Sequence, residues 1–317
     1  MSAEVMEWAH QTLEAATAAK VPALSAVLAV AAAAARFQGA LADAEGLVAE
    51  GLARGAPPAT EGYLRYMLVE VSLLDGRIDD ASRHVGELLA LAEREGLTSL
   101  ARMVGLTWQF VVAYDGDPRT AVAAAERIQV DAEASGETII ANWAVHVQGE
   151  ALIDTDPVRA GALLEDALRR ARESGDRYLQ GVALVAAASV RTRHGDPADA
   201  APLFLAVVDH WRDSGIWTQQ WTTLRNVVDL LVRLHRDQPA AVLLGALSSR
   251  RTSAAVFGAD TERMAAELEV LTERLGSEAF GALHDQGATM DDDEVVAVAR
   301  RALAHLVSAA GGRSGRS

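Results

Sequence analysis

The amino-acid sequence contains no cysteine, a single lysine and few aromatic residues. Without cysteine, the chain has no disulfide framework, no thiolate metal site and no cysteine nucleophile. The lone lysine, Lys20, excludes the Gly-x-x-x-x-Gly-Lys-Ser/Thr motif of a Walker A phosphate-binding loop. Aromatic residues make up only 5% of the chain and alanine is abundant, which favours helices because alanine loses no side-chain entropy in them.

Positive charge is scarce as well. The 317 residues include 44 acidic residues against 29 lysines and arginines, which gives a formal charge of −15 at neutral pH. This balance repels a phosphate backbone. We therefore expect no direct binding of nucleic acid.

The chain also lacks a long apolar run. The longest uncharged stretch, Val21 to Ala35, lies between Lys20 and Arg36 and is shorter than the roughly 20 residues of a membrane-spanning helix. A signal peptide begins with basic residues, whereas this stretch follows acidic ones: Glu4, Glu7 and Glu14. We expect a buried helix, no membrane partner and a cytoplasmic location, which suits the absence of cysteine.

What the sequence does contain is a repeat of about forty residues. One marker is a helix-starting Asp-Pro, in which Asp caps free amides and Pro begins the first turn without losing a hydrogen bond. A second marker is a glycine about midway, of the kind that ends a helix in the left-handed conformation. The markers are Asp117-Pro118, Asp156-Pro157, Asp196-Pro197 and Gln238-Pro239, with Gly96, Gly136, Gly175 and Gly215.

Two helices per forty-residue unit are the signature of an all-α, tetratricopeptide-like solenoid of antiparallel helix pairs. We expect a repeat array over 1–250, with a lone first helix at 3–20 that has an uncovered apolar face. A helical extension over 251–308 and a disordered tail over 309–317 would follow. The six predicted pairs span 22–55, 59–95, 97–135, 137–174, 176–214 and 216–250, the first being irregular, with its turn near Gly39 and its end near Gly55.

The carboxyl-terminal third carries a recognisable order of short segments. They are the stretch from Trp211 to Trp221, Thr223-Leu224-Arg225, Pro239-Ala240-Ala241-Val242-Leu243-Leu244-Gly245-Ala246, Phe257-Gly258, Leu275-Gly276-Ser277-Glu278-Ala279-Phe280, Gly287, and Met290 to Val296. This region resembles the carboxyl-terminal helical repeats of large bacterial LuxR-type ATP-binding regulators and their adenylate-cyclase-fused relatives. The family usually has a tryptophan where His284 stands and an arginine where Ala288 stands.

The resemblance implies a sensing or docking module without its ATPase and without its DNA-binding or cyclase domain. No Walker A loop and no basic recognition helix occurs in the sequence. It also implies a role in signal transduction and transcription regulation through a protein or peptide partner, which other domains of a regulator could supply.

Motifs for catalysis are missing. The eight histidines form no His-Glu-x-x-His, and no nucleophile elbow or phosphate loop occurs. Asp291 and Glu294 have the spacing of a capping box at a helix start rather than that of a calcium loop. We therefore expect no enzyme activity, no cofactor and no metal site.

The best candidate for function is a surface. The first helix of each pair tends to line the concave side of such a solenoid, and the period aligns three columns of side chains on these helices. The central column is Tyr66, Leu106, His146, Val185 and Arg225; one turn later lie Glu70, Phe110, Glu150, Ser189 and Asp229; one turn earlier lie Arg102, Asn142, Gly181 and Trp221. The polar and aromatic members predicted to bind a partner are Tyr66, Arg102, Asn142, His146, Glu150, Trp221 and Arg225.

Competing interpretations remain open at this point. The tryptophans at 108, 143, 217 and 221 can instead fill gaps between alanine-rich helices. A protein-docking arm predicts an open groove with a charged rim, whereas a small-molecule effector domain predicts an enclosed apolar pocket of several hundred Å³. The third alternative is a self-assembling scaffold, a homodimer formed through the uncovered helix at 3–20.

Overall fold

The computed structural model describes residues 8, 11–13, 15–16, 23–249 and 259–314. Within these ranges the chain is helical and contains no strand, so the predicted all-α fold class is confirmed. The helices of the six pairs are α2 (Leu24–Gln38) and α3 (Leu41–Ala53), α4 (Pro58–Leu74) and α5 (Ile78–Glu95), α6 (Thr98–Tyr114) and α7 (Pro118–Ala134), α8 (Thr138–Ala151) and α9 (Pro157–Ser174), α10 (Arg177–His194) and η1 (Pro197–Ala200) continued by α11 (Ala201–Ser214), and α12 (Trp217–Arg233) and α13 (Asp237–Ser249).

Three of the four proline markers begin a helix as the sequence predicts, whereas Gln238-Pro239 lies inside α13, which begins at Asp237. Asp117 and Asp156 accept hydrogen bonds from backbone N–H groups three residues on, and Asp196 accepts one from the N–H of Ala198, two residues on. The midway glycines all have φ near +70°, the left-handed conformation that closes a helix: Gly96, Gly136, Gly175 and Gly215.

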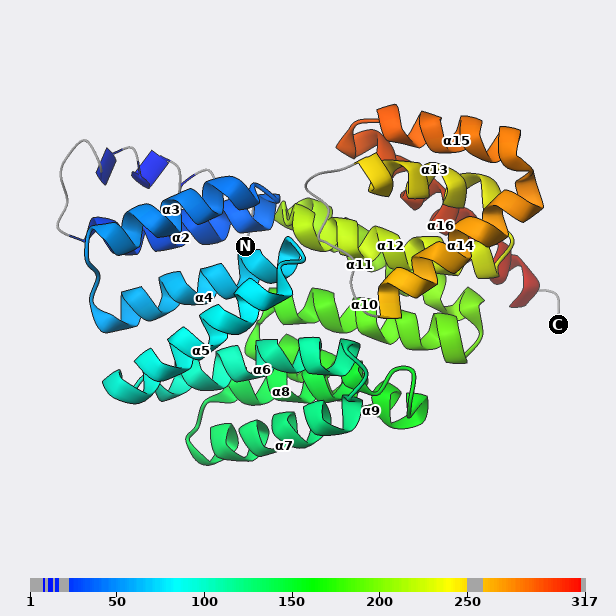
Figure 1. The fold of residues 1–317 in the computed structure, drawn as a ribbon. Helices are drawn as coiled ribbons and strands as arrows, with labels where there is room; N and C mark the ends of the chain where they lie inside the picture. The colour runs from blue at the N-terminus through cyan, green and yellow to red at the C-terminus, as the bar shows by residue number, and fades with distance from the viewer. Residues whose placement is uncertain (1–7, 9–10, 14, 17–22, 250–258, 315–317) are drawn as a thin grey trace.

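Consecutive helices pack in antiparallel pairs, and the first helices of adjacent pairs also contact one another (Figure 1). We call α4, α6, α8, α10 and α12 the inner helices. Hydrogen bonds join neighbouring inner helices at equal depth, from Trp143 near the start of α8 to Asp176 at the start of α10, and from Tyr114 to Glu150 near the ends of α6 and α8. The inner helices therefore run parallel to one another.

The first pair closes the solenoid into a ring. α2 contacts α12, and Thr218 Oγ1 donates a hydrogen bond of 3.5 Å to the carbonyl of Phe37, across 181 residues of chain. The Phe37 ring also lies against Tyr178 of α10, with centroids 5.3 Å apart. Figure 1 shows the end of the blue α2 beside the start of the yellow-green α12.

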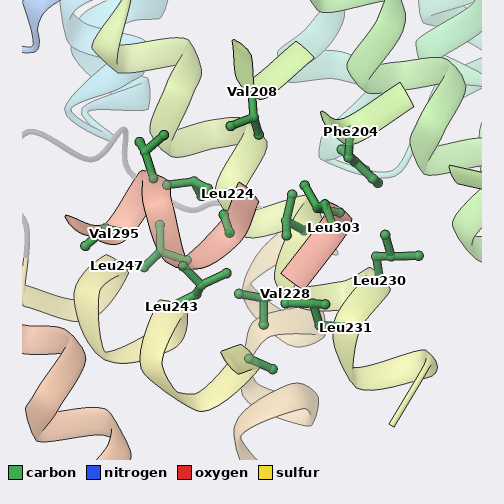
Figure 2. Close-up of a cluster of buried hydrophobic side chains, with 14 of the residues drawn as sticks. Phe204, Val208, Leu224, Val228, Leu230, Leu231, Leu243, Leu247, Val295 and Leu303 are labelled. Atoms are coloured by element: carbon green, nitrogen blue, oxygen red, sulfur yellow. The ribbon is translucent and has the colours of Figure 1, made fainter. Parts of the chain in front are cut away.

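Three further helices build a second region, which with α11–α13 we call the C-terminal block. They are α14 (Ala259–Leu275), α15 (Ser277–Thr289) and α16 (Asp292–Ser314). α16 packs against both α11 and α13, and its Leu303 is completely buried. Figure 2 shows the resulting core, in which Phe204 of α11 and Leu231 of α12 are also completely buried.

Two glycines allow α13 and α15 to cross at close range. A Cβ atom on Gly245 would lie 1.9 Å from the carbonyl oxygen of His284, and one on Gly287 would lie 1.8 Å from that of Val242. Neither backbone can approach the other with a larger residue at these points. Both glycines belong to the segments that carry the family resemblance.

The structure also bears on the predicted capping box, on both ends of the chain and on membrane spans. The capping box forms, because Asp291 and Glu294 exchange backbone-to-carboxylate hydrogen bonds of 2.8 and 2.9 Å. α16 continues to Ser314, into the stretch 309–317 that the sequence predicts to be a tail. Residues 315–317 and most of the predicted helix 3–20 lie outside the described residues. Among the described helices, none is long and apolar enough to cross a bilayer.

Candidate functional site

The inner helices surround a central cavity of about 780 Å³. Every inner helix contributes side chains to its wall, α2 adds Arg36 and Phe37, and α14 adds Asp260. The lining is mainly apolar, with aromatic and aliphatic side chains interrupted by a few polar groups. Because α2 meets α12, the concave side of the solenoid forms a half-open cavity.

Four of the seven predicted site residues line this cavity: Tyr66, His146, Glu150 and Arg225. They come from the central column and from the column one turn later. The forty-residue period thus places them on the correct face of α4, α8 and α12. Whether they bind a ligand stays a prediction.

The other three predicted residues do not line the cavity. Arg102 forms an ion pair with Glu137 at the start of the next pair. Asn142 is buried, and its amide donates a hydrogen bond of 3.5 Å to Ser174 Oγ. Trp221 is completely buried and belongs to the core of the C-terminal block.

Helix geometry explains this error. Successive helical residues are rotated by about 100°, so a step of four residues backward turns a side chain by about 40° away from the central column. A step of three residues backward turns a side chain by about 60° in the opposite direction. This is the direction in which the residues four positions after the central column are also turned. The residues one turn earlier that line the cavity are accordingly Tyr63, Met103, Trp143, Val182 and Thr222. The predicted column faces neighbouring helices instead, as at Gly181, where an added Cβ would lie 2.2 Å from the Trp211 ring.

A first polar cluster lies at the junction with α2. Arg36 is 6% exposed and forms an ion pair of 2.7 Å with Glu70. The Tyr66 hydroxyl donates to Glu70 at 3.1 Å and lies 2.9 Å from Thr107 Oγ1. Burial opposes the charge of Arg36, but Glu70 and the surrounding tyrosines outweigh it and raise the pKa of the guanidinium. Burial and Glu70 also raise the pKa of Tyr66 well above its usual range, so the phenol stays neutral.

A second polar cluster lies further along the cavity. Glu150 accepts a hydrogen bond of 2.7 Å from the Tyr114 hydroxyl, and its other oxygen lies 3.0 Å from His146 Nε2. Burial raises the pKa of the Glu150 carboxyl, but His146, Tyr114 and Arg193 together lower it below its usual range. Burial, with Glu150 nearby, raises the pKa of Tyr114 well above its usual range.

The far end of the cavity is bounded by charged groups of three helices. Arg193 lies 3.4 Å from Asp154 and 3.4 Å from Asp229. Arg263 of α14 lies 3.5 Å from the same Asp154, which brings the first turn of α14 to this end of the inner helices. Burial lowers the pKa of the nearby Arg225, and Asp260 partly offsets that effect.

Aromatic side chains are concentrated in the cavity. All four tyrosines of the chain line it: Tyr63, Tyr66, Tyr114 and Tyr178. One wall is a continuous series of five rings from four helices, which we call the aromatic wall: Phe37, Tyr178, Trp143, His146 and Phe110. Successive ring centroids along it are 5.3, 5.7, 5.6 and 5.9 Å apart.

Sequence reasoning missed part of this site. Trp143 was considered only as a residue that could fill a gap between helices. Arg36 and Phe37 were left out because the irregular first pair was not aligned with the columns, and Tyr178 because it lies two turns before Val185 on α10. The arginine that ends the long uncharged stretch was the available signal. Among the described residues, no cluster of His, Asp and Glu side chains has the geometry of a metal site.

No protein-family model matches the chain, and no curated protein matches it.

Proposed function

We propose that the protein is a small-molecule-binding effector domain that takes its ligand into the central cavity of the closed ring. The observation that carries this proposal is the contact of α2 with α12 around a cavity of about 780 Å³. Ligand pockets for small organic molecules have volumes of about 300–1,000 Å³ and mainly apolar walls with few polar groups.

The docking-arm alternative is less well supported. An extended peptide needs an open groove, whereas Phe37 and Thr218 join the two ends of this solenoid. Most side chains that face the cavity are aromatic or aliphatic. The charged side chains among them are paired, as Arg36 is with Glu70 and Glu150 with His146. Charged groups do lie at the far end of the cavity, but there Arg193 pairs with Asp154 and Asp229.

The regulatory part of the proposal rests on the resemblance alone. The segments that resemble LuxR-type regulators include Gly245 and Gly287, which have a structural role at the crossing of α13 and α15. We infer that ligand binding in the ring is the sensing step of such a regulator and that the protein carries out no chemical reaction.

Binding of two uncharged probes tests the proposal. Isothermal titration with N-phenyl-1-naphthylamine and with 1-dodecanol is expected to show one bound molecule per chain for at least one of them. Val185 lines the cavity at mid-depth. Val185→Trp places an indole in the cavity and is expected to abolish this binding.

The matched control is Val130→Trp, since Val130 lies on α7 and is 64% exposed. This variant should bind as the unmodified protein does. If neither probe binds, or if a probe binds equally well to Val185→Trp, the protein does not use the cavity for a small molecule and the proposal fails.

A further inference from the structure

The distribution of aromatic residues indicates the class of ligand. The chain is only 5% aromatic, yet all four tyrosines, together with Phe37, Phe110 and Trp143, line one cavity. Core packing alone does not require this, because the fully buried aromatic residues lie elsewhere, in the C-terminal block. The cavity is therefore built to present ring faces and ring edges.

The aromatic wall gives these rings a common surface. Its ring-to-ring distances of 5.3–5.9 Å are those of tilted and edge-to-face contacts between neighbours, so each ring is held in place by the next. The Trp143 indole is fixed further by a hydrogen bond of 3.2 Å from its Nε1 to Asp176. A preordered wall binds a flat ring system with little loss of side-chain entropy.

Most polar groups of the lining form hydrogen bonds with one another, although Arg36 Nε and His146 Nδ1 are buried without a partner. The pairs are Arg36 with Glu70, Tyr66 with Thr107, Tyr114 with Glu150, Trp143 with Asp176, Gln219 with Tyr178, and Ser189 with Asn226. A ligand rich in hydroxyl groups would lose its bonds to water and gain few from these pairs. The lining thus disfavours a sugar and favours a ligand with few polar groups.

Charge in the cavity is balanced, unlike that of the whole chain. The lining carries three arginines and four carboxylates, whereas the chain as a whole has a net charge of −15. Arg36 and Glu70 neutralise each other, and Glu150 lies against His146. An ionic ligand would have to leave water without an equivalent gain inside.

We propose that the ligand is an uncharged, planar, fused-ring aromatic molecule that lies against the aromatic wall. This inference rests on the proposed function, since it names the occupant of the same cavity. Aliphatic chains fit the volume equally well but gain nothing from the ring faces. Each aromatic contact strengthens binding by up to about tenfold beyond the effect of its buried area.

Three probes separate the classes. N-phenyl-1-naphthylamine has the expected chemistry, 8-anilino-1-naphthalenesulfonate adds a sulfonate to the same rings, and 1-dodecanol is uncharged but aliphatic. The first probe is expected to bind at least about tenfold more tightly than either of the others. All titrations use the full chain, with Val185→Trp to confirm that binding occurs in the cavity.

Substitutions at Trp143 test the wall directly. Trp143→Leu is expected to weaken N-phenyl-1-naphthylamine binding about tenfold and to leave 1-dodecanol binding unchanged. Trp143→Phe keeps a ring but not the hydrogen bond to Asp176, and should retain most of the affinity. The control is Trp108→Leu, because Trp108 packs between α4, α5 and α6 and does not line the cavity.

The outcomes distinguish this inference from the proposed function. If 1-dodecanol binds as tightly as the aromatic probe and Val185→Trp blocks both, the cavity binds a small molecule but the aromatic class is wrong. If the sulfonate binds as tightly as its uncharged counterpart, the charge argument is wrong. Equal loss of both uncharged probes in Trp143→Leu would likewise overturn a role for ring contacts.

Discussion

The ring and the C-terminal block use apolar residues in opposite ways. In the block, large side chains such as Trp211, Phe204 and Leu303 are completely buried in one continuous core. In the ring, all four tyrosines, Phe37, Phe110 and Trp143 face the cavity, and the helix pairs are held together by several small clusters in which alanine is prominent. Removing a large side chain from the block leaves a void, whereas the ring already encloses one. We therefore expect substitutions of large side chains to cost more stability in the block than at the cavity wall.

Truncating a phenylalanine in each region gives the largest contrast. Phe204→Ala is expected to lower the free energy of unfolding by about 3–5 kcal/mol, since the buried ring leaves an unfilled cavity. Phe110→Ala, at the cavity wall, should cost about 1 kcal/mol but weaken binding of N-phenyl-1-naphthylamine. Urea denaturation measures the first effect and titration the second. Equal destabilisation by the two variants would remove the distinction between the regions.

The crossing of α13 and α15 is the next most sensitive point. Gly245→Ala drives a Cβ atom into the backbone of α15 and should lower the free energy of unfolding by about 3 kcal/mol. Gly161→Ala is the matched control, because Gly161 lies in α9 with no atom within 4 Å of an added Cβ. That variant is expected to be slightly stabilised, by up to about 1 kcal/mol, through its higher helix propensity. If the denaturation midpoints of Gly245→Ala and Gly161→Ala shift in the same direction and by similar amounts, the close crossing of α13 and α15 is contradicted.

A buried carboxyl links the two regions and makes stability depend on pH. Burial, reinforced by the charge of Asp229, raises the pKa of Glu267 from 4.5 to about 8. The folded protein therefore keeps a proton that the unfolded chain releases, so stability falls as the pH rises from about 4.5 to about 8. Glu267→Gln should remove this decline and raise the free energy of unfolding at pH 8 by about 2 kcal/mol.

The control for this titration is Glu262→Gln, which changes an exposed residue of the same helix. Denaturation of all three proteins at several pH values measures the slopes. The Glu262 variant should keep the slope of the unmodified protein. An unchanged slope in Glu267→Gln would show that another group is responsible.

The smallest expected effect is at the closure of the ring. Phe37→Leu loses the contact with Tyr178 and that with the Arg36 guanidinium, which lies 4.0 Å from the centre of the ring. We expect a loss of about 1 kcal/mol in global stability. Faster hydrogen exchange at the start of α12 should accompany it, while α11, α13 and α16 stay protected. Uniform exchange in the two regions would mean that closure is not a local event.

Local signals in the sequence sufficed for the helices but not for the ring. Asp-Pro starts and left-handed glycines act within a few residues, so the pairs could be predicted with their turns. Closure depends on Phe37 and Thr218, which are 181 positions apart and carry no pattern of their own. Within the site, the period identified Tyr66 and His146, but a step of four instead of three residues exchanged Thr222 for Trp221. The repeat alone does not predict long-range contacts, nor whether a side chain one turn earlier lies three or four residues back in a helix of 3.6 residues per turn.

Because the inner helices run parallel, their macrodipoles add to an electrostatic field along the axis of the cavity. Each helix has a macrodipole equivalent to about half a positive charge at its amino end and half a negative charge at its carboxyl end. The starts of these helices lie at one end of the cavity, near Ser99 and Gln219, and their ends lie at the other, near Tyr114 and Arg193. In an apolar interior this axial field is weakly screened. An uncharged ligand with a permanent dipole therefore has one preferred orientation, with its electron-rich end toward the helix starts.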